Sequence, residues 1–169
     1  MIPKKIFFTR GIGHADEKLI SFENALKDAQ IACYNLVRVS SILPAKCEQI
    51  PLENGIKQLN PGQIVYSVIS EITYNGNSPN KEKNVFASIG IAKPKDKNLY
   101  GYLSEYSGAN RNLEDVKKES CNLAMKLLQS SRNDTKIECD TYEITSYLKL
   151  NFTPMPDFIT CIAAAVFIE

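Results

Sequence analysis

The 169-residue sequence predicts an α/β (α+β) fold, a layered sandwich of mainly antiparallel β-sheets flanked by helices in a single domain. Stretches rich in β-forming residues outnumber stretches with helical periodicity, of which there are two. The last apolar stretch is nearly continuous, which indicates a strand buried on both faces. The length and the apolar fraction of 44% are those of an ordinary globular domain, so we expect one compact core.

The N-terminal part of the chain predicts a strand, a turn and a helix. The strand covers residues 4–9, and the Gly11-Ile12-Gly13 segment after it has the backbone freedom typical of a turn. A helix then continues to about residue 29, with Ser21 as its N-cap, because apolar residues recur at helical spacing: Phe22, Ala25, Leu26 and Ala29.

The dipeptide Ser40-Ser41 follows the next predicted strand. Residues 32–39 are rich in β-formers, and Pro44 interrupts regular pairing soon after them, so the stretch as far as Gly62 is predicted to be a loop. Hydrophobic patterning in the rest of the chain predicts three strands, a second helix and two final strands, at residues 63–74, 85–92, 99–106, 112–130, 136–150 and 158–168.

Composition excludes several classes of partner. The formal net charge of +1 would not attract nucleic acid or an anionic membrane, so neither is expected. Residues 1–10 contain no apolar run long enough for a signal peptide, and no stretch approaches the roughly 18 apolar residues of a membrane helix, so we expect a cytoplasmic protein. Five scattered cysteines and a single histidine, His14, argue against a disulfide framework and against a zinc site. We expect reduced thiols, mostly in the core, and no metal.

A Ser-Ser dipeptide alone indicates no chemistry, and a second one, Ser130-Ser131, ends the second predicted helix. Ser40-Ser41 differs in its context of three blocks, at residues 21–29 (SFENALKDA), 35–44 (NLVRVSSILP) and 101–108 (GYLSEYSG). Together these blocks resemble the pyruvoyl-dependent arginine decarboxylase family. The similarity extends over nearly the full length, with the order and spacing of the blocks preserved.

The resemblance implies a self-processing lyase (carboxy-lyase). The chain would undergo autocatalytic serinolysis between Ser40 and Ser41, giving a beta fragment, 1–40, and an alpha fragment, 41–169, that stay packed as one domain. Ser41 would become a covalent pyruvoyl cofactor, with no PLP and no metal. The implied reaction converts L-arginine to agmatine and CO2.

The resemblance also assigns roles to further side chains. The family asparagine that matches Asn35 assists the site, and the glutamate that matches Glu105 donates a proton. Glu23, with Ser40, would bind substrate, and its carboxylate would face the guanidinium group. Glu23 is also a departure, because archaeal members carry Asp there, and the longer side chain changes the depth of the pocket.

The chemistry fits these residue types. A hydroxyl one residue after a polarised carbonyl can attack it and convert the amide to an ester, and β-elimination from serine then leads to pyruvoyl. The pyruvoyl ketone would bind the amine of the amino acid as a Schiff base and accept the electrons that CO2 leaves behind. Glu105, in a partly apolar setting, would reprotonate the α-carbon, so its loss should slow turnover without preventing self-cleavage.

Each assignment has a structural alternative. Asn35 would otherwise be a strand-edge residue bonded to a turn, although its amide suits a developing oxyanion. Glu105 would be a solvated strand residue, and Glu23 part of a solvated helix face. We leave Arg38 out of the site, since an arginine on the outer face of a strand more often makes a surface ion pair.

The resemblance implies a homo-oligomer, a trimer or a dimer of trimers, with active sites between protomers. Two rival functions stay open: a pyruvoyl decarboxylase of another amino acid, and an unprocessed, non-catalytic oligomeric binding protein. A panel of amino acids would separate the first rival, and an intact Ser40-Ser41 bond would support the second. The site chemistry does not distinguish polyamine biosynthesis from acid consumption as the physiological pathway.

Overall fold

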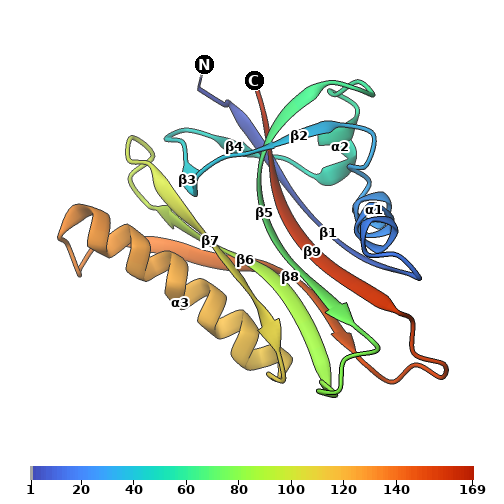
Figure 1. The fold of residues 1–169 in the computed structure, drawn as a ribbon. Coiled ribbons are helices and arrows are strands. Elements are labelled where there is room, and N and C mark those ends of the chain that lie inside the picture. Colours follow the sequence, from blue (N-terminus) through green and yellow to red (C-terminus); the bar gives the residue numbers. More distant parts are fainter. Residues whose placement is uncertain (1) are drawn as a thin grey trace.

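The computed structural model describes residues 2–169 as four layers, with a helix on the outer face of each of two stacked sheets (Figure 1). This confirms the predicted sandwich. The elements in chain order are β1 Lys5–Ala15, α1 Lys18–Asp28, β2 Asn35–Arg38, β3 Ile42–Leu43, β4 Glu48–Gln49, α2 Leu52–Ile56, β5 Ile64–Asn75, β6 Asn84–Pro94, β7 Gly101–Ala109, α3 Leu113–Arg132, β8 Cys139–Lys149 and β9 Phe158–Ile168.

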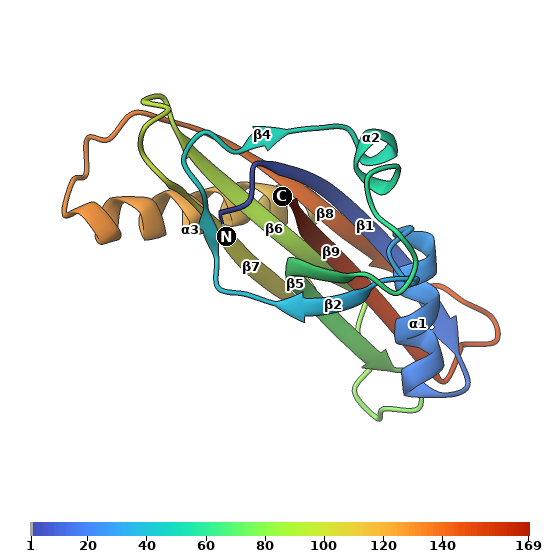
Figure 2. The same ribbon diagram turned by 90° about the horizontal axis from the view of Figure 1, so that it is seen from above.

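The two sheets are mainly antiparallel. The first has the strand order β2-β5-β9-β1-β4, and the second has the order β3-β7-β6-β8. The long strands pair antiparallel, and the parallel pairs are confined to two edges of the first sheet, where β2 joins β5 and β4 joins β1. Figure 2 shows the two sheets overlapping in the view from above, with α1 and α3 on opposite sides.

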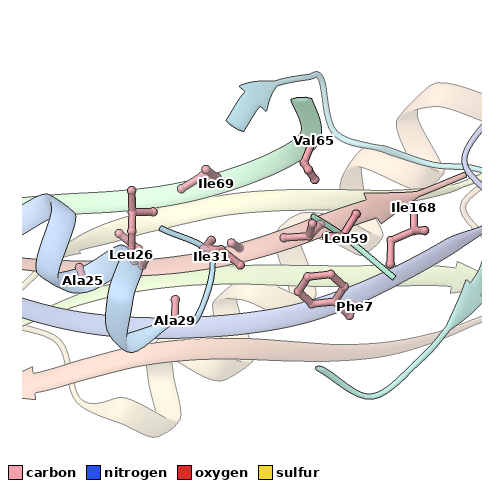
Figure 3. Close-up of a cluster of buried hydrophobic side chains, with 12 residues drawn as sticks. Phe7, Ala25, Leu26, Ala29, Ile31, Leu59, Val65, Ile69 and Ile168 are labelled. Atoms are coloured by element: carbon pink, nitrogen blue, oxygen red, sulfur yellow. The ribbon is translucent and has the colours of Figure 1, made fainter. Parts of the chain in front are cut away.

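The core fills each space between layers. Between α1 and the first sheet lies the cluster shown in Figure 3, in which Phe7, Ala25 and Ala29 have no exposed surface. A second cluster between the sheets includes Leu43 and Leu103, which come from β3 and β7. Strand β9 is buried on both faces from Ile159 to Ile168, as its continuous apolar sequence predicts.

The prediction of a turn at Gly11-Ile12-Gly13 is wrong, because β1 continues straight through it to Ala15. The two glycines let α1 lie close to the strand. A Cβ at Gly11 would lie 2.1 Å from the Ala25 carbonyl oxygen, and one at Gly13 would lie 2.2 Å from that of Ser21. The glycines therefore serve close packing between helix and sheet instead of backbone bending.

The prediction of Ser21 as N-cap is also wrong. Helix α1 begins one turn earlier, and Glu17 occupies the N-cap position without a side-chain hydrogen bond. Ser21 is fully buried, and its hydroxyl lies 2.8 Å from the hydroxyl of Thr160 on β9. The small polar side chain that resembles a cap in the sequence instead joins the helix to the sheet.

Helix α3 agrees more closely with its predicted range. Asn112 is its N-cap and accepts a hydrogen bond from the backbone nitrogen of Asp115 at 2.8 Å. Apolar spacing over this range predicts a buried face that includes Val116, Leu127 and Leu128; the prediction is partly wrong, because Leu127 is 41% exposed whereas Ser120 is fully buried. Ser120 packs where a Cβ at Gly90 would lie 1.9 Å from its carbonyl oxygen, so α3 also approaches its sheet at a glycine.

The predicted strand 32–39 is shorter in the structure, and the predicted loop up to Gly62 contains β3, β4 and the short helix α2. The thiols are free, but only Cys47 and Cys161 are buried, whereas Cys121 and Cys139 are half-buried and Cys33 is exposed, so the expectation that most lie in the core is wrong. Within residues 2–169, no helix combines the length and the apolar character needed to cross a membrane.

Candidate active site

The Ser40-Ser41 peptide lies where the chain passes from one sheet to the other. Strand β2 before it belongs to the five-stranded sheet, and β3 after it belongs to the four-stranded sheet. On the first side, the Val39 amide donates to the Ser67 carbonyl at 3.0 Å. On the second side, the Leu103 amide donates to the Ser41 carbonyl at 2.8 Å. The peptide bond is therefore held between anchors on two different sheets.

The Ser41 hydroxyl faces a carboxylate. Its Oγ donates a hydrogen bond to Oε2 of Glu105 at 2.7 Å. Glu105 lies on β7, two residues after Leu103 and so on the same face of the strand, beyond the point where β3 stops pairing with β7. The two residues are 64 positions apart in the sequence, and the register of β3 against β7 brings them together.

The surroundings of Glu105 differ from the partly apolar setting that we expected. Its side chain is exposed in the protomer, although its neighbours Leu103 and Ser104 are buried. The carboxylate is thus accessible from solvent as well as from Ser41.

The Ser40 carbonyl is engaged by the backbone. The Ile42 amide donates to the Ser40 oxygen at 3.0 Å, which closes a tight turn centred on Ser41. Beside it lies a groove of about 520 Å³ with mainly apolar walls, lined by Ile2, Pro3, Val39, Ser40, Ile42, Pro44, Tyr66 and Phe167. Among the described residues 2–169, none that lines this groove carries a carboxylate to pair with a guanidinium group.

Asn35 lies at the opposite end of β2. Its Nδ2 donates to the Gly62 carbonyl at 2.6 Å, which matches the alternative of a strand-edge asparagine bonded to a turn. It lines a larger groove of about 740 Å³ between α1, β2 and β5, together with Phe22 and Leu26 of α1. Within residues 2–169 of one protomer, no hydrogen bond joins Asn35 to Ser40 or Ser41.

Glu23 also lies away from Ser41 in the protomer. Its carboxylate is 3.9 Å from Nζ of Lys27, one helical turn later, and its side chain is 40% exposed. Arg38 pairs with Glu71 in the larger groove and donates to the Ile69 carbonyl at 3.3 Å, as a surface arginine should. One protomer therefore brings Ser40, Ser41 and Glu105 together, but not Glu23 or Asn35.

Two groups at the site escaped prediction because they belong to the backbone. The Ile42 amide donates to the Ser40 carbonyl, and the Leu103 amide donates to the Ser41 carbonyl. Hydrophobic patterning gives no information about which backbone groups meet, since that depends on strand register. The Pro44 signal correctly marked the end of pairing, but it could not give the partner strand.

Cys47 is the nearest thiol along the chain, six residues after Ser41. Burial raises its pKa to about 11, with Lys93 opposing part of the shift. A buried, neutral thiol is a poor nucleophile near neutral pH. The nucleophile that the structure places in contact with an acid–base group is thus Ser41.

Comparisons with known proteins show which family the chain is similar to. The family model for pyruvoyl-dependent arginine decarboxylase (PvlArgDC) matches residues 5–169. The chain is 40% identical over 168 residues to "Pyruvoyl-dependent arginine decarboxylase 1" of Methanosarcina acetivorans, covering 99% of this chain and 97% of the relative. It is 41% identical over 171 residues to "Pyruvoyl-dependent arginine decarboxylase 1" of Archaeoglobus fulgidus, covering 99% of both.

A solved structure of a pyruvoyl-dependent histidine decarboxylase aligns with 66% of this chain and 53% of its own length. The TM-score is 0.46 and the identity 14%, which is too distant to support an argument about the site. The family match over nearly the whole length, with two full-length relatives near 40% identity, is sufficient on its own. The chain belongs to the pyruvoyl-dependent arginine decarboxylase family.

Proposed function

We propose that this chain cleaves itself between Ser40 and Ser41 and then, with a pyruvoyl group made from Ser41, decarboxylates L-arginine to agmatine and CO2. The observation that supports this best is the hydrogen bond from Ser41 Oγ to Glu105 at 2.7 Å in the uncleaved chain. Family membership gives the reaction class, and the names of the relatives suggest arginine as the substrate.

Self-cleavage follows from these contacts. The Ser41 hydroxyl passes its proton to the Glu105 carboxylate, and Oγ bonds to the Ser40 carbonyl carbon. The tetrahedral adduct collapses by breaking the C–N bond, and the nitrogen takes up a proton, which leaves an ester. Loss of the Ser40 carboxylate by β-elimination gives dehydroalanine at position 41, and addition of water with release of ammonia gives the pyruvoyl group.

The fragments should remain together after cleavage. Fragment 1–40 contains β1, α1 and β2, and β1 pairs with β9 along its whole length from Lys5 to Ala15. Fragment 41–169 provides the strands on both sides of β1, since β9 and β4 are its neighbours. Separation would remove a strand from the interior of the five-stranded sheet and expose the core beneath α1.

The residues around position 41 fit a pyruvoyl group. When present, that group supplies an electron sink for the carbanion left by loss of CO2. The Leu103 amide holds the carbonyl of residue 41 at 2.8 Å and so fixes its orientation on β7. Glu105, directed at the side chain of residue 41, can return a proton to the α-carbon of the substrate.

Binding of the substrate guanidinium requires a carboxylate, and we assign this role to Glu23. Because Glu23 and Ser41 are not in contact within a protomer, a second protomer would have to bring its α1 to the Ser41–Glu105 pair. We therefore propose that active sites form between protomers, in a trimer or a dimer of trimers. The free thiols suit a reducing compartment, and we propose the cytoplasm as the place of action.

The intact mass of freshly purified, denatured protein tests this proposal. Two fragments split after Ser40, the larger with a blocked N-terminus, would support self-processing. The rate of agmatine release from arginine, compared with the rates at which ornithine, lysine and histidine are decarboxylated, would then establish the substrate. A single full-length chain that persists on long incubation would refute the proposal and favour a non-catalytic oligomer.

A further inference from the structure

Strand β2 runs beside the start of β5 and ends shortly before the scissile bond (Figure 2). In this parallel pair, the Asn35 amide donates to the Gln63 carbonyl at 2.9 Å, and the Val39 amide donates to the Ser67 carbonyl at 3.0 Å. Hydrogen bonds in a parallel ladder are evenly spaced, so alternate residues of β2 donate to alternate residues of β5. The next bond of the series would join residues two positions further along each chain segment.

That next donor is the amide of Ser41, which is the nitrogen of the scissile bond, and the next acceptor is the carbonyl of Ile69. Within residues 2–169, no hydrogen bond uses the Ser41 N–H. The Ile69 carbonyl accepts instead from Nη1 of Arg38 at 3.3 Å. The guanidinium of Arg38 therefore occupies the place in the ladder that the scissile amide would take if β2 continued.

Glu71, further along β5, orients this guanidinium. Nη2 of Arg38 pairs with the Glu71 carboxylate, while Nη1 is directed at the Ile69 carbonyl. The side chains of Arg38 and Glu71 are 51% and 40% exposed, so solvent screens their attraction and the pair should contribute little to overall stability. Its main effect is on geometry, because a planar guanidinium held at one nitrogen presents its other nitrogen in a fixed direction.

We propose that Arg38 is a positioning residue for self-cleavage, a role that rests on the function proposed above. It caps the β2–β5 ladder at Ile69 and so keeps the scissile peptide out of the first sheet. Ser41 is then free to turn to the second sheet, where its carbonyl accepts from Leu103 and its hydroxyl donates to Glu105. As the C–N bond breaks, the Ser41 nitrogen leaves the peptide plane to take up a proton, and no ladder bond opposes that movement.

The rate of self-cleavage in full-length Arg38→Met tests this role. Cleavage is followed on gels after a short pulse of cell-free synthesis, so that the uncleaved chain is seen first. Methionine is also unbranched but has no N–H for the Ile69 carbonyl, which leaves the Ser41 amide as the next donor in the ladder. We expect cleavage to slow by about 10- to 100-fold, because the nucleophile is displaced from its attack geometry. Arg38→Lys keeps a charged donor and should recover part of the rate.

Hydrogen exchange of the residue 41 amide reports where that N–H goes. The measurement uses two uncleavable Ser41→Ala chains, one with natural Arg38 and one with Arg38→Met. We expect the residue 41 amide to exchange about tenfold more slowly in the Arg38→Met chain, because it then donates to the Ile69 carbonyl. Loss of a purely structural contact would leave this exchange unchanged or make it faster.

Two further variants separate positioning from stability. Arg10→Met is the matched control, because Arg10 also donates from Nη1 to a backbone carbonyl, that of Thr145 at 2.7 Å, but joins β1 to β8. Glu71→Gln removes the charge that orients Arg38 and should slow cleavage less than Arg38→Met does. In the double variant Glu71→Gln should add nothing to Arg38→Met, since both changes act on one contact.

Slow cleavage and slow exchange in Arg38→Met, with the cleavage rate and thermal midpoint of Arg10→Met equal to wild type, would support the proposal. If Arg38→Met lowers the thermal midpoint, the same two measurements on Glu71→Gln decide. Cleavage within twofold of wild type, or slow cleavage without slower exchange at residue 41, would overturn the proposal and leave the proposed function intact. A wild-type chain that never cleaves would overturn the proposed function itself, and this inference with it.

Discussion

The chain contains two Ser-Ser dipeptides in very different structural settings. Ser130 and Ser131 end helix α3, where the Ser131 hydroxyl donates to the Leu128 carbonyl at 2.8 Å. The Ser130 carbonyl accepts from the Asn133 amide at 3.3 Å, a capping bond of the helix. Hydroxyl and carbonyl are both used in local helix bonds, and neither meets an acid–base group.

The Ser40-Ser41 dipeptide has the same composition but different partners. The Ser41 hydroxyl donates to a carboxylate on another strand, and the Ser40 carbonyl accepts from a backbone amide. The reactive arrangement results from the crossing between two sheets, which ends regular pairing on both sides of the dipeptide. The comparison teaches that the partners of the dipeptide, and not the residue types, decide whether it can react.

Substitution of one hydroxyl in each dipeptide gives the largest expected difference. Ser41→Ala removes the nucleophile and the source of pyruvoyl, so we expect no fragments and no agmatine. Ser131→Ala removes only a back-bond within a helix, so cleavage should match wild type and stability should change by about 0.5 kcal/mol or less. Intact mass and agmatine assays measure both. Fragments from Ser41→Ala, or blocked cleavage in Ser131→Ala, would contradict the comparison.

The next largest effect concerns the carboxylate that distinguishes the two settings. Glu105→Gln keeps the size and a hydrogen bond to Ser41 but cannot take up or return a proton. Turnover by the processed enzyme should fall about 10²- to 10⁴-fold. Self-cleavage should also slow, because Glu105 contacts the Ser41 hydroxyl before cleavage.

A glutamate on α3 provides the matched control. Glu114 lies on α3, nine residues after Glu105; its side chain is 85% exposed, and its carboxylate lies 3.7 Å from Nζ of Lys117. Glu114→Gln should leave cleavage and turnover unchanged. Fragment formation by mass and the rate of agmatine release by matured protein must be measured separately. Wild-type rates in Glu105→Gln would show that the contact with Ser41 is only structural.

The sequence supplied the identity of Ser41 and Glu105, but not their contact. Their 2.7 Å hydrogen bond depends on the register that pairs Ile42 with Tyr102, and no local sequence pattern between the two residues, which are 64 positions apart, predicts that register. Resemblance to a family identified the two residues, and only the folded sheets show that they contact each other. Local patterns therefore predicted the strands better than their partners.

Local patterns failed most clearly where tertiary packing reassigned a residue. Gly11 carries a turn signal, yet it lies within β1. A glycine is needed there because any side chain would meet the Ala25 carbonyl. Ser21 has the chemistry of a cap, yet it bonds to Thr160 in the interior. In both cases the position requires a small residue, and the reason is the element packed against it: α1 for Gly11 and β9 for Ser21.

A smaller effect should come from Glu23, which tests whether α1 of another protomer completes the site. Glu23→Gln removes the charge proposed to pair with the guanidinium, so kcat/KM for arginine should fall about 10- to 100-fold, with cleavage unchanged. Glu17→Gln is the control, since Glu17 precedes the same helix without a side-chain capping bond. Steady-state kinetics give the ratio. Equal kcat/KM values in the two variants would remove Glu23 from the substrate site.

The smallest expected effect is on the free energy of unfolding at alkaline pH. It comes from Cys47, which follows β3 of the second sheet. Burial raises the pKa of Cys47 to about 11 from its ordinary value of 9.0, so the folded chain keeps this thiol neutral where the unfolded chain ionises it. The resulting stability is fully present below pH 9 and is lost as pH rises through 11. The loss is at most roughly 2 to 3 kcal/mol for this group.

Denaturant unfolding measures this loss. From pH 8 to 11, the free energy of unfolding should decline less steeply in Cys47→Ala than in Cys33→Ala, because Cys33 is exposed. Identical slopes in the two variants would mean that burial of Cys47 does not couple stability to pH on this side of the site.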